Sequence, residues 1–295
     1  GGSIRVPASL SGVVGHATTY ARVPMHPNKT HHTVIHTGVL AASARDAALA
    51  YMLMAPSDPA HAYTRMYGEG TGGPPAPHVL GFTDVGSLSG VKLGVFWEWF
   101  EDGDAEVVGA CKAAVAALQA RGAEVVNITI PHMRWLAMAH GMIISTEFMS
   151  AHEAHYWLDR HVFEPDHRIG LGLARTFSGV EMLAANKMRA FAFEYVQTLM
   201  KEHDLAAIVN PTTGMTAPTI EFPDWPGVSD TSLKLRFMKG IFLTNLIGNP
   251  GVSVPAGYDA RGLPVGLHLM GRHWGDAEVL RLAHALEVHH LRHQP

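Results

Sequence analysis

The stretch VKLGVF at residues 91–96, an alanine-rich run at residues 104–121 and AEVVNITI at residues 123–130 together decide the fold class. The first and third are apolar and rich in β-branched residues, which predicts two buried strands. The run between them predicts a helix that ends before Gly122, a residue suited to the left-handed conformation. A strand, a helix and a strand with short connections form a βαβ unit with parallel pairing, which indicates an α/β fold.

Further predicted elements continue the alternation on both sides of this unit. Helices are predicted over residues 44–54, 181–201, 233–247 and 276–291, and strands over residues 205–209, 252–254 and 264–270. Ser43 followed by Asp46 predicts a capped start for the first of these helices. The first 80 residues are otherwise read as loop-rich, and prolines and glycines make residues 56–81 an irregular connection.

The composition narrows the functional classes. The chain has 295 residues, 47% of them hydrophobic, and a formal net charge of −4, so it offers no basic surface for nucleic acid and no polybasic membrane patch. Charged residues make up 16%, against roughly 25% in typical proteins, which predicts that part of the surface is normally covered. The single cysteine, Cys111, excludes an internal disulfide and fits a reducing, intracellular compartment.

Twenty histidines raise the question of a metal site. His152 and His155 lie three residues apart beside Glu153, and other histidines gather at residues 31–36 and 289–293. None of them forms the helical two-histidine motif with an intervening glutamate, and one cysteine cannot build a thiolate zinc site. Scattered surface imidazoles explain the pattern more simply, so we predict no metal and no organic cofactor.

The opening segment, GGSIRVPA at residues 1–8, holds the candidate chemistry. Gly1 and Gly2 let backbone N–H groups approach a ligand closely, as an oxyanion hole requires. Ser3 follows directly and could attack a carbonyl held there, provided that another group takes its proton. On these eight residues alone, a simple glycine turn is the better interpretation.

Other segments change that interpretation because they occur in one order with the opening. They are SGVVG at residues 11–15, residues 38–46, NPTT at 210–213, NLIGNPG at 245–251, VPAG at 254–257 and GLPVGL at 262–267. This series resembles the amidase signature family over nearly the whole chain. GVFWEWF at residues 94–100 and PTTGMTAP at residues 211–218 most resemble plant-type fatty acid amide hydrolases. Indoleacetamide hydrolases and the amidase component of glutamyl-tRNA amidotransferase share much of the same frame.

The resemblance implies an α/β/α layered sandwich around a mixed, twisted sheet, with a Ser–Ser–Lys triad. By position, Ser3 matches the nucleophile that forms the acyl ester, and Gly1, Gly2 and Ser3 match the oxyanion hole of the substrate-binding site. The lysine and the bridging serine lie before Gly1 in the family. The resemblance therefore implies that residues 1–295 are the C-terminal portion of a single amidase domain, inactive and poorly soluble alone, and no lysine of this chain is assigned as the base.

The implied activity is hydrolysis of carboxylic amides through an acyl-enzyme, acting in lipid metabolism on fatty acid amides such as N-acylethanolamines. Two alternatives remain: an amidase for short amides such as indoleacetamide, and a non-catalytic fragment or partner-binding half. The expected partner is a small-molecule amide, with no nucleic acid. A peripheral membrane contact of the longer protein and a homodimer are left open.

The sequence departs from the family pattern near the nucleophile and near the end. HATT at residues 16–19 replaces the usual LKPT, Ala21 replaces a glycine and His268 replaces a common glutamine. These changes put the local geometry in question more than the reaction class. Arg5 is expected to fix the nucleophile loop through a carboxylate partner, a structural role.

Two apolar groups have two interpretations each. The stripe on residues 181–201, with Phe237, Met238 and Ile241, could line an acyl-chain channel, but a stripe at helical spacing is more often core. Trp97, Trp99 and Phe100 could form an exposed patch for a membrane or a partner, or a turn packed on the sheet.

Overall fold

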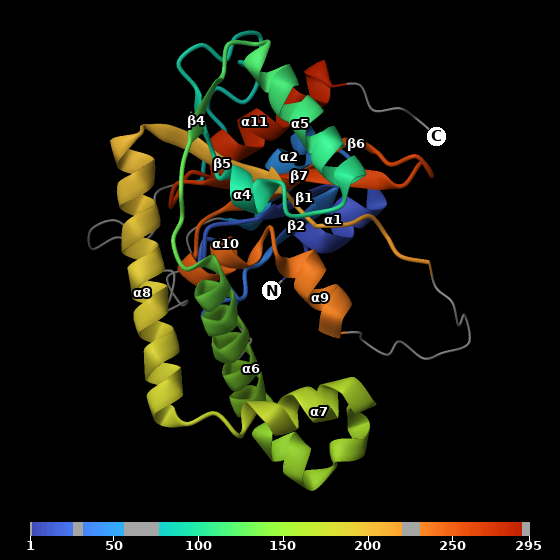
Figure 1. Ribbon diagram of the computed structural model, residues 1–295, viewed down its shortest axis with the longest axis vertical. Coiled ribbons are helices and arrows are strands. Elements are labelled where there is room, and N and C mark those ends of the chain that lie inside the picture. The colour runs from blue at the N-terminus through green and yellow to red at the C-terminus, as the bar shows by residue number, and fades with distance from the viewer. Residues whose placement is uncertain (1, 26–31, 56–76, 220–230, 291–295) are drawn as a thin grey trace.

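The computed structural model describes residues 2–25, 32–55, 77–219 and 231–290, which form a seven-stranded sheet in the order β2-β1-β6-β7-β5-β3-β4 with helices on both faces (Figure 1). The strands are β1 (Val14–Ala17), β2 (Gly38–Ala41), β3 (Lys92–Val95), β4 (Glu124–Asn127), β5 (Leu205–Pro211), β6 (Gly251–Tyr258) and β7 (Pro264–Gly271). The helices are α1 (Arg5–Ser11), α2 (Ala44–Met54), α4 (Trp97–Phe100), α5 (Ala105–Gln119), α6 (Met133–Leu158), α7 (Pro165–Ala174), α8 (Gly179–Glu202), α9 (Thr231–Met238), α10 (Phe242–Ile247) and α11 (Asp276–His289), with a 3-10 helix η1 (Arg160–Val162).

The predicted βαβ unit is confirmed as β3, α5 and β4. Leu93 pairs with Val125 in a parallel register, and Gly122 takes the left-handed conformation at φ 103°. On its other side β3 pairs with β5, again in parallel. The remaining neighbours are antiparallel, so the sheet is mixed, as the resemblance implied.

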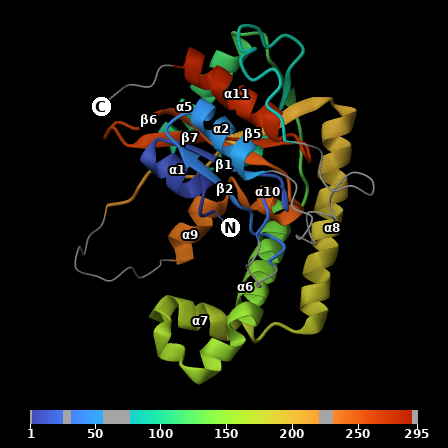
Figure 2. The ribbon, with the colours of Figure 1, turned by 180° about the vertical axis from the view of Figure 1, so that it is seen from behind.

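The two faces of β6 show how the layers are built. Val252 and Val254 belong to a core cluster shared with α2, α5 and α11. Figure 2 shows α2 and α11 in front of the sheet from that side. Because side chains alternate along a strand, Gly251 and Ser253 face the opposite layer, where α1, α6, α8 and α10 lie. The result is the α/β/α sandwich that the resemblance implied, and the small and polar residues of β6 face α1.

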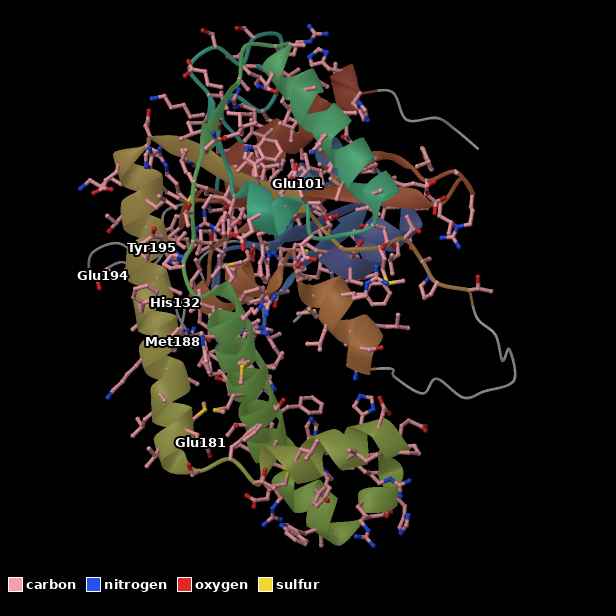
Figure 3. All side chains as sticks on the ribbon, in the orientation of Figure 1. Glu101, His132, Glu181, Met188, Glu194 and Tyr195 are labelled. Atoms are coloured by element: carbon pink, nitrogen blue, oxygen red, sulfur yellow. The ribbon has the colours of Figure 1, made fainter. Side chains whose placement is uncertain are left out.

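Helices α6 and α8 extend beyond the sheet and carry α7 at their far end (Figure 1). The prediction of a helix over residues 181–201 is confirmed by α8. It begins with a capping box in which the Ser178 Oγ accepts a hydrogen bond from the Glu181 N–H. Figure 3 shows Glu181 at this end of α8. Helix α6 has 26 residues and was not predicted.

The helix predicted over residues 233–247 is wrong as a single element, because the chain breaks between α9 and α10. The reason lies at Gly240, where the backbone packs against the end of β5. A Cβ atom at Gly240 would overlap the Pro211 carbonyl oxygen. The Asn210 Nδ2 atom donates to the Gly240 carbonyl at 2.8 Å. At the Gly240 carbonyl, this side-chain donor takes the place of a helical N–H donor, so α9 and α10 do not form one continuous helix.

The prediction that the first 80 residues are loop-rich is also wrong in part. Besides the predicted helix α2 they contain α1, β1 and β2, and β1 is buried along its whole length. Helix α1 has 7 residues and each strand has 4, which is too short for a periodicity to emerge. Most of the irregular connection predicted over residues 56–81 lies outside the described residues. Its last part, residues 77–81, has neither helix nor strand.

The aromatic residues of α4 pack on the sheet, which supports the second interpretation. Phe100 is buried, the Trp97 Nε1 atom donates to the Asn127 Oδ1 at 2.7 Å, and the Trp99 Nε1 atom donates to the Lys239 carbonyl at 3.1 Å. Within the described ranges, no helix combines the length and apolarity that a membrane crossing requires.

Candidate active site

Ser3 lies two residues before α1, and its side chain is exposed at a cavity of about 460 Å³. The cavity is bounded by the start of α1 and by residues of α6, α7, α9 and α10. Its apolar wall consists of Ile4, Ile35, Ile144, Phe148 and Leu171. The predicted nucleophile is therefore placed where a small molecule with an apolar part could reach its hydroxyl.

Gly2 is packed tightly against the ends of neighbouring side chains. A Cβ atom there would lie 2.6 Å from the Met238 Sδ atom and 2.9 Å from the Ile241 Cδ1 atom, closer than real contacts allow. The Gly2 carbonyl accepts a hydrogen bond from the Val6 N–H at 2.9 Å, which leads into the first turn of α1. Gly1 lies outside the described residues, so the oxyanion hole assigned to Gly1, Gly2 and Ser3 stays a prediction.

Arg5 is buried at the first position of α1, and its guanidinium contacts three neutral acceptors. The Nη1 atom donates to the His268 Nε2 at 2.8 Å. The Nη2 atom donates to the Asn245 Oδ1 and, at 3.4 Å, to the Ile241 carbonyl. The expected carboxylate partner is wrong, since no carboxylate of the described residues contacts this guanidinium. Burial lowers the pKa of Arg5 to about 9, so the group still carries its charge at neutral pH.

The contact with Arg5 determines which ring nitrogen of His268 carries the proton. A guanidinium can only donate, so the His268 Nε2 atom must accept, and the ring proton sits on Nδ1. Burial, and then the Arg5 charge, hold the pKa of His268 well below its usual value. A neutral imidazole can thus do what the family's common glutamine oxygen could do, which is to accept a hydrogen bond from Arg5.

Asn245 connects Arg5 to the loop that follows residue 31. Its Oδ1 atom accepts from Arg5, and its Nδ2 atom donates to the Val34 carbonyl at 2.9 Å. That loop supplies Ile35 and His36 to the cavity wall. Asn245, the first residue of the NLIGNPG segment, therefore links helix α1 to the loop that forms part of the cavity wall.

The far part of α1 is held by paired hydroxyl groups. The Ser9 Oγ atom accepts from the Gly266 N–H at 3.1 Å and lies 3.3 Å from the Thr213 Oγ1. Nearby, the Thr212 Oγ1 and Ser253 Oγ atoms lie 2.8 Å apart. These residues come from the NPTT segment, from β6 and from the GLPVGL segment. Two of the motifs that carry the family resemblance, NPTT and GLPVGL, thus meet beneath α1.

His36 is a buried, neutral residue of the cavity wall. Its Nδ1 atom lies 2.6 Å from the Thr18 carbonyl oxygen, so Nδ1 carries the proton and donates it. Burial, and then the charge of Arg5, lower the pKa of His36 to about 3. The ring therefore stays uncharged throughout the physiological range.

Three polar residues, Asp166, His167 and Lys234, line the cavity on the side of α7 and α9. Asp166 on α7 lies with its Oδ2 atom 3.8 Å from the Lys234 Nζ on α9, and its Oδ1 atom lies 3.3 Å from the His167 Nδ1. All three line the same cavity as Ser3. Lys234 is thus held by a carboxylate, and no structural feature here assigns it as the base for Ser3.

A second buried polar cluster lies on the other face of the sheet. The Asp276 Oδ1 atom accepts from the His16 Nε2 at 3.1 Å and from the Thr19 N–H at 3.0 Å. Its Oδ2 atom accepts from the Thr19 Oγ1 at 2.6 Å. The HATT segment, which differs from the family pattern, therefore has a hydrogen-bond partner in Asp276. These hydrogen bonds join the β1 region to the start of α11.

The structure also bears on two further expectations, which concern the apolar stripe of α8 and a possible metal site. The α8 stripe is core in part. Met182, Met188, Tyr195 and Leu199 pack into one cluster, whereas Leu183 and Phe191 are exposed. No residue of α8 lines the cavity of Ser3. Figure 3 shows Met188 and Tyr195 on α8, the long helix beside α6. Among the described residues, no three His, Cys, Asp or Glu side chains are grouped as a metal site would need.

Sequence reasoning singled out Gly1, Gly2, Ser3 and Arg5, but it gave no role to the residues that distant elements bring to the cavity. Asn245 was quoted within a motif without a function. Asp166 and Lys234 were not singled out as site residues, because they lie 163 or more positions from Ser3 and no local pattern marks them. Their nearness follows from the arm of α6, α7 and α8, which the sequence did not predict in full.

Comparison with known sequences gives a consistent result. A sequence model of the family described as Amidase matches residues 1–280. The fatty acid amide hydrolase of Arabidopsis thaliana is 34% identical over 294 residues, which cover 97% of this chain and 47% of that protein. The fatty acid amide hydrolase of Medicago truncatula is also 34% identical, over 97% of this chain and 47% of that protein. A glutamyl-tRNA(Gln) amidotransferase chain of Koribacter versatilis is 30% identical, over 97% of this chain and 62% of that protein.

Solved structures share the fold. A glutamyl-tRNA(Gln) amidotransferase chain of Thermotoga maritima superposes with a TM-score of 0.76 at 25% identity, over 97% of this chain and 60% of that one. A chain of an inhibitor-bound complex, from work on the evolutionary origins of an s-triazine catabolic enzyme, superposes with a TM-score of 0.79 at 26% identity. The superposition covers 97% of this chain and 61% of that one. The chain spans about half the length of the fatty acid amide hydrolases that it matches.

Proposed function

The chain belongs to the amidase family, and on that basis we propose that the protein containing it is a serine hydrolase of fatty acid amides such as N-acylethanolamines. The observation that carries the proposal is the position of Ser3, exposed just before helix α1 at a cavity with an apolar wall. The 34% identity to plant fatty acid amide hydrolases supports the choice of substrate class.

In the proposed reaction, the Ser3 Oγ atom attacks the carbonyl carbon of the amide. The C–N bond then breaks, and the amine leaves with a proton, which gives an acyl-enzyme ester on Ser3. Water hydrolyses this ester to the carboxylic acid and restores the serine. The N–H groups of Gly1, Gly2 and Ser3 are the proposed donors to the oxyanion.

The residues around α1 support this chemistry by fixing the nucleophile. Arg5, two positions after Ser3, is held by His268 and Asn245, and Ser9 is held by Gly266. Preorganised positions of this kind lower the barrier, because a reacting atom already stands at its required place. We propose that the proton of Ser3 passes to a lysine through a bridging serine in the longer protein, as the family resemblance implies.

The nucleophile is tested with a serine-directed fluorophosphonate probe on the longer protein, followed by peptide mass spectrometry. We expect the label on Ser3, and we expect Ser3→Ala to lose the label and the turnover together, since the attacking atom is gone. Ser11→Ala is the matched control, because Ser11 is an exposed serine at the other end of α1 and does not line the cavity. Normal turnover by Ser3→Ala would contradict the assignment.

A substrate series separates the fatty acid amide proposal from its alternatives. We expect the longer protein to hydrolyse long-chain amides with a higher kcat/KM than indoleacetamide. The reverse order would favour an amidase for short amides. Turnover of neither class, with no label on Ser3, would favour a non-catalytic, partner-binding role.

A further inference from the structure

We propose that Asp166 is a specificity-determining residue, which accepts a hydrogen bond from a hydroxyl group on the amine half of the amide substrate. This inference rests on the proposed function and deepens it. The proposed contact selects amides of amino alcohols, such as N-acylethanolamines, over otherwise equal amides whose amine half is purely apolar.

The first support is the state of the Asp166 carboxylate. Its side chain is 13% exposed and lines the cavity that Ser3 also lines. Among the described residues it receives no hydrogen bond, and its partners are the His167 Nδ1 atom at 3.3 Å and the Lys234 Nζ atom at 3.8 Å. A carboxylate has about four acceptor positions, so this one has acceptor capacity directed at a space that a ligand can fill.

The second support is the contrast with the apolar part of the cavity wall. Ile4, Ile35, Ile144, Phe148 and Leu171 form an apolar wall. A fatty acyl chain has no hydrogen-bond donor and fits such a wall. Of the two halves of a fatty acid amide, only the amine half can carry a donor. The polar group of α7 and α9 therefore suits the amine half.

Helix geometry alone does not account for this arrangement. Asp166 is in the first turn of α7, where an acidic side chain interacts well with the helix dipole. An exposed carboxylate would serve that purpose equally, as the neighbouring Glu164 could. The burial of Asp166 in the cavity wall, opposite Lys234 on another helix, is the feature that a ligand explains.

The experiment compares two matched substrates, N-octanoylethanolamine and N-propyloctanamide, which differ by a hydroxyl in place of a methyl. In the longer protein we expect kcat/KM to favour the ethanolamide by about 10- to 100-fold, the range for a hydrogen bond to a charged group. Asp166→Asn is expected to bring the ratio within a few-fold of one. Asp166→Glu is expected to restore part of the preference.

Glu164→Gln is the matched control, since it removes a charge from the start of the same helix without lining the cavity. A merely structural role of Asp166 would change both substrates alike and leave their ratio unchanged. Calorimetric binding of the same two amides to Ser3→Ala gives the ratio without turnover, so it also decides the inference if the protein proves to be non-catalytic. If Ser3→Ala keeps its turnover, the kcat/KM ratios of the wild type and Asp166→Asn still decide it. An equal preference in the wild type and Asp166→Asn, by both measures, would overturn the proposal.

Discussion

Asp276 carries a charge in the interior, and donors from the first twenty residues hold it in place. Burial alone would raise the pKa of this carboxyl, but the hydrogen bonds from His16 and Thr19 lower it below its ordinary value. A lowered carboxyl pKa means that the folded state gains stability from the ionised form. That stability is complete above the unfolded value of about 4 and is lost as the pH falls through the lower folded value.

The prediction at this scale is a change in acid stability. Asp276→Asn should lower the free energy of unfolding at pH 7 by about 3 kcal/mol, because it removes the charged acceptor of three buried hydrogen bonds. It should also flatten the loss of stability between about pH 5 and pH 2, since the titrating group is gone. Urea unfolding at a series of pH values measures both effects. The exposed Asp84→Asn is the control, and a slope unchanged by Asp276→Asn would contradict this explanation.

Single residues also show the limits of sequence reasoning. Arg5 was correctly expected to have a structural role, since a buried guanidinium needs partners. The kind of partner was predicted wrongly, because His268 and Asn245 lie 263 and 240 positions away. Both act as neutral acceptors, and a sequence does not show which acceptors the folded chain brings to a charge.

At the scale of elements, the break between α9 and α10 is set by contact with β5. Gly240→Ala should destabilise the fold by about 3 kcal/mol, because the new methyl group overlaps the Pro211 carbonyl and the backbone cannot move away cheaply. Gly109→Ala should instead stabilise it by about 0.5–1 kcal/mol, since Gly109 is an exposed residue inside α5 with open space around it. Thermal unfolding of the two variants provides the measurement. Similar effects of both changes on the unfolding temperature would contradict the explanation that the close approach at Gly240 requires glycine.

Elements with strong local signals were predicted well. Helix α2 was predicted with its bounds, because Ser43 caps it and Pro56 follows it. Strands β3, β5 and β7 were found from their apolar runs. Helix α1 and strands β1 and β2 were missed, since seven or four residues carry too little periodicity. The antiparallel half of the sheet depends on pairings between distant segments, which no local pattern displays.

For the whole molecule, the low charge led to the expectation of a covered surface, and the structure has exposed leucines where such a cover could lie. Leu40 on β2 is 50% exposed, and Leu49 and Leu53 on α2 are 62% and 73% exposed. Strand β2 forms one edge of the described sheet. Exposed apolar residues next to a sheet edge favour association.

The corresponding prediction concerns dye binding by the 295-residue chain. The double change Leu49→Gln and Leu53→Gln should reduce the fluorescence of a hydrophobic dye and shift size-exclusion chromatography toward smaller species. The free energy of unfolding should change by less than about 0.5 kcal/mol, because both side chains are on the surface. Arg45→Gln on the same helix serves as the control. Unchanged dye fluorescence would place the binding surface elsewhere.

The anchoring of α1 has a consequence for biosynthesis. Arg5 leaves the ribosome well before His268, which follows 263 positions later. At a synthesis rate of about 5–20 residues per second, that separation corresponds to roughly 13–53 s. Throughout this interval the segment around Ser3 cannot be locked, because β7 does not yet exist. A nascent chain therefore carries the segment of the proposed nucleophile in an unassembled form, and this segment is fixed in place only when nearly all of these residues have been made.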